Sequence, residues 1–397
     1  MQTQVLPYLR QINKGGITVI LLTFEPNPKD TWTEEQIEAE RKLLANEGIE
    51  WHFLTYHKRP TVPATLFDVV CGVWFTWKTI RREKIDVLHA RSHVATMMGA
   101  IAKKLSRKKP KLLFDIRGFF PEEYTEGGMW KPDGRLYHAV KRAEHWLFKE
   151  SDAFVVLTER ARDILFPESR ETGFDKQQRP VEVIPCCVDL KRFEVVNETS
   201  RREMRKKLGV ENRRVIVYIG SFTNKWYMPL EIADLLGVAK EKDDKIFALI
   251  LTQSPIEIIK SLLEGRGFGE KDYFIQKVSP KEIPLYLAAA DAAVSFIKPC
   301  FSKLASSPTK NAEYLASGLP MIANSGVGDT AEMTLEDEVG VIVDEFSHES
   351  YEKALIDIDN LAEINPNLTE SCKKSAEKRF DLEAVGGKRY LNLYRKL

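Results

Sequence analysis

Short apolar runs alternate with longer amphipathic stretches along this 397-residue chain, and the whole alternation occurs twice. This pattern is typical of parallel sheets that are covered by helices on both faces. Right-handed crossovers between successive strands then give doubly wound, Rossmann-like α/β domains. The predicted strands are Ile17–Thr23, Val87–Ala90, Leu112–Asp115 and Ala153–Leu157 in the first half, and Val215–Ile219, Phe247–Leu251, Tyr273–Gln276, Ala292–Phe296, Met321–Ala323 and Val339–Val343 in the second.

A polar, highly charged stretch, Glu194–Lys207, separates the two halves and suits a linker that leads into a helix. We therefore predict an N-terminal domain over residues 1–195 and a C-terminal domain over residues 196–380, facing each other across a cleft. Ligands of such sheets bind outside the carboxyl ends of the strands. Function is therefore sought in the residues that follow each strand.

The first strand of the N-terminal domain is predicted to be missing. Gln2–Lys14 has the pattern of a helix that ends at Gly15 and Gly16, and the first clear strand is Ile17–Thr23. A doubly wound domain usually begins with a strand and a glycine-rich turn, which often touches the substrate. Either the sequence starts late or the domain does without that loop.

Bulk composition excludes several classes of protein. A net charge of +1 gives no strong field for nucleic acid. The five cysteines form no C-x-x-C pair, which favours reduced thiols in a cytoplasmic protein over a disulfide framework or a zinc site. The N-terminus does not resemble a signal peptide. The most apolar stretch, Thr65–Trp77, contains Asp68 and is too short to cross a membrane, so we expect a protein that is soluble or lies on a membrane surface.

Basic residues are concentrated between Lys78 and Lys111, where eleven Lys or Arg side chains stand against two acidic ones. The densest part is Lys103–Lys111. One interpretation is the solvated end of a helix. The other is a peripheral contact with an anionic membrane, because clustered basic residues attract lipid headgroups.

The segment Ser306–Pro320 carries the strongest chemical signal. Ser307 and Pro308 suit the N-cap and the first position of a helix, and Gly318 suits its left-handed end. Lys310 then lies in the first turn, where a cation opposes the helix dipole. A bound anion would account for this lysine, because free N–H groups, the dipole and an ammonium together form a phosphate site.

Glu313 lies three residues after Lys310, so both side chains share one face of the predicted helix. A carboxylate beside a phosphate site can accept two hydrogen bonds from a ribose diol. The alternative interpretation is a well-capped surface helix with an incidental Lys–Glu pair.

Two loops of the second half follow predicted strands and suit a bound diphosphate. Gly220, Ser221 and Lys225 come after its first strand, and Gly326 and Gly328 come after its fifth. Glycines let a backbone approach a ligand closely, and hydroxyls and a lysine can bind phosphate oxygens. Ordinary loops explain each pattern about as well.

In the first half, Arg91, His93 and Arg117 follow strand ends and are expected to point into the cleft. His89 lies within a strand, where a packed histidine is the favoured interpretation. Metal binding is not expected, because the one D-x-D sequence, at residues 357–359, falls within an amphipathic helix on which alternate side chains diverge.

Several short pieces of the sequence occur in an order that matches one known family. They are Gln4–Leu9, Asp86–Ser92, Phe114–Phe119, Ser151–Ala153, Leu157–Thr158, Val183–Asp189, Phe193, Tyr218–Ser221, Ala290–Ala292 and Ser307–Pro320. Through them the chain resembles, over nearly its whole length, the bacterial retaining glycosyltransferases of the GT-B fold, family 4 type. The resemblance implies a nucleotide sugar bound by the C-terminal domain and an acceptor bound by the N-terminal one, with no metal or other cofactor. It also implies that the last helix, within residues 381–397, crosses back to the first domain.

Roles for individual residues follow from this resemblance. It implies that the donor ribose contacts Glu313, that Lys225 and Lys310 hold the diphosphate, and that Arg117, Lys310 and Glu313 form the catalytic group. The full donor group is Gly220, Ser221, Lys225, Ser307, Pro308, Thr309, Lys310, Glu313, Gly326 and Gly328, and the acceptor group is Arg91, His93, Asp115 and Arg117.

The chain departs from the family pattern at three positions. Ala305 replaces the first of two glutamates, Ser221 replaces an arginine, and Arg117 replaces a histidine. Lys310 is expected to take over part of the role of the missing glutamate.

We therefore predict a metal-independent hexosyltransferase that moves a sugar from a nucleotide donor to a glycan or lipid-linked acceptor in cell-surface polysaccharide synthesis. Two alternatives stay open. One is a nucleotide-sugar epimerase of the same fold. The other is a catalytically inactive nucleotide-sugar-binding homologue, which the missing first loop and the substituted glutamate favour.

Overall fold

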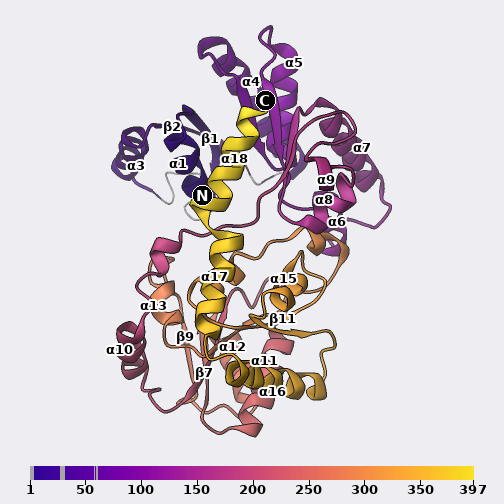
Figure 1. The fold of residues 1–397 in the computed structure, drawn as a ribbon. Coiled ribbons are helices and arrows are strands. Elements are labelled where there is room, and N and C mark those ends of the chain that lie inside the picture. Colours follow the sequence, from indigo (N-terminus) through magenta and orange to yellow (C-terminus); the bar gives the residue numbers. More distant parts are fainter. Residues whose placement is uncertain (1–3, 27–31, 58, 60) are drawn as a thin grey trace. The chain divides into compact units, whose positions relative to one another are not determined.

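The computed structural model describes residues 4–397 except 27–31, 58 and 60, and the chain folds into two compact units (Figure 1). Unit 1 holds the described residues of Met1–Leu157 together with Ala161–Ile184 and Gly386–Leu397. Unit 2 holds Thr158–Arg160 and Pro185–Val385.

Unit 1 contains two parallel sheets, one of two strands and one of four strands in the order β3-β4-β5-β6. The two central strands of the larger sheet are buried, as expected where helices cover both faces, whereas its edge strand β3 is only half-buried. The strands are β1 (Val19–Pro26) and β2 (Ile49–Tyr56), then β3 (Val87–Arg91), β4 (Lys111–Asp115), β5 (Ala153–Val156) and β6 (Val181–Val183). The helices are α1 (Leu6–Lys14), α3 (Glu34–Asn46), α4 (Thr61–Arg82), α5 (His93–Leu105), α6 (Phe120–Glu126), α7 (Arg135–Glu150), α8 (Glu159–Leu165), α9 (Ser169–Thr172) and α18 (Lys388–Arg395).

Unit 2 contains one parallel sheet in the order β12-β11-β10-β7-β8-β9. The chain winds outward from β7 to β9 and then returns to lay β10 on the other side of β7, so the strand order reverses between β7 and β10. Such a reversal is where doubly wound sheets bind ligands. The strands are β7 (Arg214–Ile219), β8 (Ile246–Leu251), β9 (Tyr273–Gln276), β10 (Ala292–Ser295), β11 (Met321–Asn324) and β12 (Gly340–Val343).

The helices of unit 2 cover both faces of this sheet. Val215 and Val217 of β7 belong to one buried cluster, whereas Ile216 and Tyr218 belong to the other, because successive side chains of a strand point to opposite faces. The α-helices are α10 (Glu198–Leu208), α11 (Pro229–Lys242), α12 (Ile256–Glu264), α13 (Ile283–Leu287), α14 (Thr309–Ala316), α15 (Thr330–Glu336), α16 (His348–Ile364) and α17 (Leu368–Phe380). Within the described residues of either unit, no helix has the length and apolar character needed to span a bilayer.

The α/β class and every strand predicted from the sequence are confirmed, with small shifts at the strand ends. The strands β2 and β6 were not predicted, because the prediction followed continuous apolar runs, whereas β2 begins with alternating buried apolar and polar residues and β6 has only three residues. In the described part of unit 1, α1 is the first element and β1 the first strand.

The C-terminal domain was predicted to begin at residue 196, but the chain enters unit 2 earlier, at Pro185. The amide of Cys186 donates to the Ser307 hydroxyl at 3.0 Å, and the amide of Val188 donates to the Phe380 carbonyl at 2.9 Å. The last residues return to unit 1, where Arg389 donates to the Val183 carbonyl at 2.6 Å.

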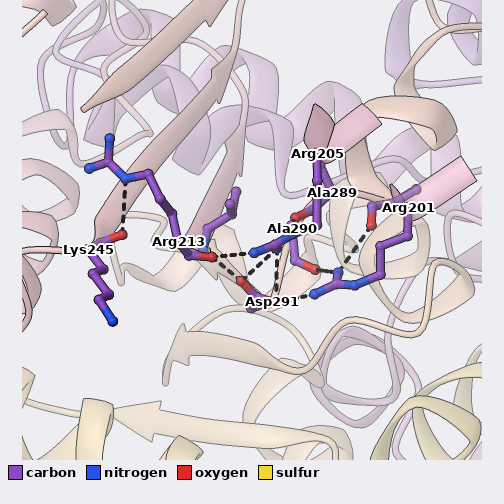
Figure 2. A network of polar contacts seen from close by, with 9 residues as sticks. Arg201, Arg205, Arg213, Lys245, Ala289, Ala290 and Asp291 are labelled. Atoms are coloured by element: carbon purple, nitrogen blue, oxygen red, sulfur yellow. Dashed lines mark hydrogen bonds and ion pairs between the residues drawn. The ribbon is translucent and has the colours of Figure 1, made fainter. Parts of the chain in front are cut away.

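The predicted linker is a helix, α10, that is fixed to the end of the unit 2 sheet by Asp291 (Figure 2). Arg205 lies 3.2 Å from one Asp291 carboxylate oxygen, and Arg201 pairs with the other. The same carboxylate accepts the Val215 amide at 2.7 Å, at the start of β7. The two guanidinium groups also donate to main-chain carbonyls at residues 288–290. This network therefore joins α10 to the strand whose far end begins the candidate site.

Candidate functional site

Helix α14 is held against the carboxyl ends of β7 and β10 by two buried polar side chains. Asn311 accepts a hydrogen bond from the Ser295 hydroxyl at 2.6 Å. The Tyr314 hydroxyl accepts the Ile219 amide at 2.7 Å and contacts the Val294 carbonyl at 3.2 Å. These bonds fix the beginning of α14 beside the point where the strand order of unit 2 reverses.

The structure corrects the predicted start of this helix. Pro308, not Ser307, is the N-cap residue, and it provides no side-chain cap. Ser307 lies one residue too early to cap the helix, and its hydroxyl accepts the Cys186 amide instead. The predicted end is confirmed, because Gly318 follows the last turn with a left-handed φ of 76°. The first turn of α14, which contains Thr309, therefore lacks the side-chain acceptor that usually satisfies such amides.

The Lys310 side chain lies in this first turn and is only 7% exposed. Its ammonium forms no hydrogen bond with any residue that the structure describes. It lies 4.5 Å from the ring centroid of Tyr218 and 5.0 Å from that of Tyr227. Burial lowers the pKa of Lys310 to about 7, because the charged form loses its hydration. Two aromatic faces offset part of that loss through cation–π attraction.

Glu313 lies one turn further along α14 and is also 7% exposed. Burial raises the pKa of its carboxyl to about 7, and the charge of Arg192 opposes this rise. Arg192 itself lies in the short 3-10 helix Leu190–Phe193, and its guanidinium also donates to the Pro280 carbonyl. Lys310 and Glu313 are thus two buried titratable groups on one helix, at the ligand-binding end of the sheet.

The loop after β7 forms a tight turn around Ser221. The Ser221 hydroxyl accepts the amides of Thr223 at 3.1 Å and Asn224 at 3.2 Å. A Cβ on Gly220 would lie 2.5 Å from the Tyr218 hydroxyl, so the close approach of this turn requires glycine. Lys225, at the far side of the turn, is exposed.

The second predicted glycine loop packs against the protein itself. A Cβ on Gly326 would lie 2.9 Å from Pro299, and one on Gly328 would lie 2.1 Å from the Ser306 carbonyl oxygen. The amide of Gly328 donates to the Lys303 carbonyl at 2.8 Å. Contacts within unit 2 therefore account for these two glycines without any ligand.

In unit 1, the predicted acceptor residues Arg91 and Arg117 converge on a third, Asp115, which is fully buried at the end of β4. Its carboxylate lies 3.5 Å from Arg91 and 3.4 Å from Arg117. It also accepts the Tyr390 hydroxyl at 3.0 Å and lies 3.4 Å from the His89 ring. Burial alone would raise the pKa of Asp115, but Arg117, His89 and Arg91 together hold it well below its ordinary value.

The structure corrects the expectation that His93 points into a cleft. Its ring is buried, lies 2.9 Å from a Glu144 carboxylate oxygen and stacks on Phe120 at a centroid distance of 5.1 Å. Sequence position alone placed it at a strand end, whereas the helix that begins there turns its ring into the core. His89 packs as expected, with Tyr394 at 2.8 Å.

Sequence reasoning did not single out the aromatic residues of the unit 2 site. Tyr218 and Tyr227 lie beside the Lys310 ammonium, and the Lys303 ammonium lies 3.9 Å from the ring centroid of Trp226. The adjacent pair Trp226-Tyr227 in a polar loop was the available signal. Among the described residues, no group of three or more His, Cys, Asp or Glu side chains could hold a metal ion.

Two Rossmann-like α/β units, with the final helix returned to the first, define the GT-B class of fold. A glycosyltransferase from Rickettsia africae shares this fold with a TM-score of 0.70 at 15% identity, over 98% of this chain and 94% of that one. HepE from Anabaena, in complex with UDP-glucose, has a TM-score of 0.66 at 15% identity, over 98% and 95%. A trehalose-6-phosphate structure from E. coli, bound with UDP-2-fluoro glucose, has a TM-score of 0.68 at 13% identity, over 98% and 95%.

Sequence comparison is more specific than the fold. Residues 1–192 match the model of Glycosyltransferase Family 4, and residues 200–379 match that of Glycosyl transferases group 1. The chain therefore belongs to the family 4, group 1 glycosyltransferases. Spore coat protein SA of Bacillus subtilis is 26% identical over 236 residues, which are 56% of this chain and 60% of that relative, so the match spans less than two thirds of the relative.

Proposed function

We propose that this glycosyltransferase moves a hexose from a nucleotide sugar to a glycan or lipid-linked acceptor, with retention of anomeric configuration, in cell-surface polysaccharide synthesis. Two proteins of similar fold are described as complexes with UDP-glucose and UDP-2-fluoro glucose. The donor then occupies the α14 end of unit 2, and the acceptor lies at Arg91, Asp115 and Arg117 of unit 1.

The donor assignment depends on one observation, the buried ammonium of Lys310. It has no hydrogen-bond partner among the described residues, and it lies in the first turn of a helix without a side-chain cap. Burying an ammonium in this way is unfavourable unless an acceptor is supplied. A diphosphate would supply acceptor oxygens to Lys310 and to the amides of α14.

The proposed chemistry uses this positive end of unit 2 to stabilise the leaving group. The bond between C1 of the sugar and the diphosphate oxygen breaks, and the acceptor oxygen bonds to C1 on the same face. The acceptor hydroxyl gives its proton to the departing diphosphate oxygen. Negative charge then develops on the diphosphate, where Lys310 and the first amides of α14 stabilise it. Glu313 accepts hydrogen bonds from the ribose diol, and Lys225 supports the diphosphate. We propose that no metal is needed for this step.

Nucleotide-sugar binding by matched lysine variants tests the proposal. A panel of UDP-, GDP- and ADP-hexoses is screened by thermal shift, since a bound donor stabilises the fold. Lys310→Met should bind the selected donor about 10–100-fold more weakly, as expected for loss of one charge-assisted contact. Lys207→Met is the control, because Lys207 lies over a single tyrosine ring at 5.6 Å and is exposed. Equal donor affinity in Lys310→Met and wild type would overturn the donor assignment.

Product analysis separates the alternatives. Mass spectrometry of reactions with glycan and lipid-linked acceptors should show a transferred hexose, and NMR should show the donor's anomeric configuration in the product. Unchanged rates with EDTA support a metal-independent step. An isomerised nucleotide sugar without acceptor would show an epimerase, and binding without turnover would show an inactive homologue.

A further inference from the structure

Helix α4 presents large apolar side chains to solvent. Leu66, Phe67, Val70 and Trp74 are each more than half exposed. They recur at spacings of three and four residues, so they form one continuous strip, here called the α4 outer face. Single exposed apolar residues are ordinary on soluble proteins, but a contiguous apolar strip marks an interaction surface.

The opposite face of α4 is fixed to unit 1, so the outer face cannot turn inward. Asp68 is buried, accepts the His57 amide at 2.9 Å and lies 2.6 Å from the His57 ring. A Cβ on Gly72 would lie 2.4 Å from the Met98 sulfur of α5, so the two helices touch at this glycine. The orientation of α4 is therefore determined by polar and steric contacts on its inner side.

The α4 outer face continues into a basic end. The Lys78 ammonium lies 5.1 Å from the ring centroid of Trp74, and the Arg81 guanidinium lies 4.7 Å from that of Trp77. Lys78 and Arg81 are exposed. Trp and basic residues in this arrangement suit the boundary between a membrane's acyl chains and its headgroups.

Helix α5 lies beside α4 (Figure 1), and basic residues occupy and follow its last turn. The indole N–H of Trp77 donates to the Leu105 carbonyl at 3.3 Å, so the two helix ends adjoin. Arg107 lies two residues after Leu105, and both side chains are exposed. The basic end of α4 and the residues after α5 therefore form one cationic border beside the apolar strip.

Ion pairs within unit 1 reduce the charge that the stretch Lys103–Lys111 offers to a partner. Lys103 and Lys111 pair with Asp152, Lys104 pairs with Glu150, and Lys108 pairs with Asp86. This stretch alone is thus a weaker anion-binding surface than the sequence predicts. The α4 outer face adds a strip of exposed apolar side chains, which the basic stretch Lys103–Lys111 does not offer to a partner.

We propose that the α4 outer face docks on an anionic phospholipid bilayer. Leu66, Phe67, Val70 and Trp74 enter the interface, while Lys78 and Arg81 bind lipid phosphates at headgroup depth. A second copy of the chain is a less suitable partner. Its apolar strip would bury Lys78 and Arg81 without acceptors, and its basic end would place like charges against them. This inference goes beyond the proposed transfer reaction and does not depend on it.

Vesicle flotation tests the proposal. The wild-type protein should float with vesicles of phosphatidylcholine and phosphatidylglycerol, less so as salt rises, and not with phosphatidylcholine alone. Phe67→Ser/Trp74→Ser should lose flotation, and Lys78→Gln/Arg81→Gln should weaken it roughly five-fold per basic residue removed. Leu335→Ser/Ile364→Ser is the matched control, since it removes two exposed apolar residues of unit 2 and should float like the wild type.

Three results would overturn the proposal. One is a wild-type protein that does not float with anionic vesicles. Another is equal flotation of Phe67→Ser/Trp74→Ser and wild type, with folded protein verified by circular dichroism. The third is a wild-type dimer in sedimentation velocity that Phe67→Ser/Trp74→Ser dissociates, because this would assign the α4 outer face to a second copy.

Discussion

At the residue scale, Lys310 and Glu313 are a pair whose burial moves two ordinary pKa values toward each other. The pKa of Lys310 falls to about 7 and that of Glu313 rises to about 7. Neither group is held by a strong partner in the described residues. The two groups are therefore poised to gain or lose a proton when an anion or a diol binds beside them.

Donor binding should take up a proton at Lys310 above pH 7. The diphosphate stabilises the ammonium and raises its pKa in the complex, so affinity falls as pH rises from about 7 toward the ordinary pKa of lysine. Calorimetry at pH 8 in buffers of different ionisation enthalpy should show an uptake of up to about one proton. Lys310→Met should show none. A wild-type protein that binds its donor at pH 8 without proton uptake would contradict this account.

The sequence was informative about Lys310 and misleading about Ser307 for physical reasons. A lysine in a first helical turn opposes the dipole, and that misfit can be recognised from neighbouring residues alone. The aromatic contacts of Lys310 come from β7 and a distant loop, so local patterns do not reveal them. Ser307 has the composition of a cap, but its hydroxyl bonds to Cys186, which is 121 residues away.

At the scale of elements, the turn after β7 couples backbone packing to the aromatic surroundings of Lys310. Gly220→Ala should push the Tyr218 hydroxyl, cost about 1–3 kcal/mol of stability and weaken donor binding. Gly209→Ala is the control, because Gly209 has a φ of 67° but a Cβ there would meet nothing within 4 Å. Urea unfolding should show a loss of stability in both variants, because both place alanine at a positive φ. Donor titration should show weaker binding in Gly220→Ala alone.

Strands and helices with a strong apolar pattern could be predicted from the sequence. The elements that were missed have identifiable physical reasons. In β2, the buried Ile49 and Trp51 alternate with the polar Glu50 and His52, which is the period-two pattern of a half-buried strand. A prediction made from continuous apolar runs misses this pattern. Helix α4 was seen only as an apolar stretch that runs into a basic helix. Its apolar residues occupy both sides of the helix, so no periodicity indicates that one strip faces solvent.

At the scale of the whole molecule, α18 contributes a hydrogen-bond donor to the buried carboxylate of Asp115. Tyr390→Phe should destabilise unit 1 by about 1–2 kcal/mol, because it removes one donor from a buried acceptor. Tyr137→Phe is the control, since its hydroxyl bonds to Glu122 at 3.1 Å nearer the surface. Hydrogen exchange should show faster opening of β3 and β4 in Tyr390→Phe, with unit 2 unchanged. Equal exchange in both variants would contradict this role for α18.

The division into two halves was visible in the charged stretch that forms α10, but the convergence on Asp115 was not. That group gathers side chains from β3, the segment after β4 and α18, and no spacing rule relates residues 89–117 to residue 390. The return of the last helix was expected only from the family resemblance.

Because unit 1 is discontinuous, its assembly during translation cannot follow chain order. Residues 386–397 leave the ribosome only after all of unit 2 has been made. Until then, Asp115 lacks the Tyr390 hydroxyl, and the hydroxyl group that Tyr394 offers to His89 is also absent. Domains usually mature from the N-terminus during synthesis. Here the second unit can complete its core first, and the first unit gains these two hydroxyl contacts only when the final helix arrives.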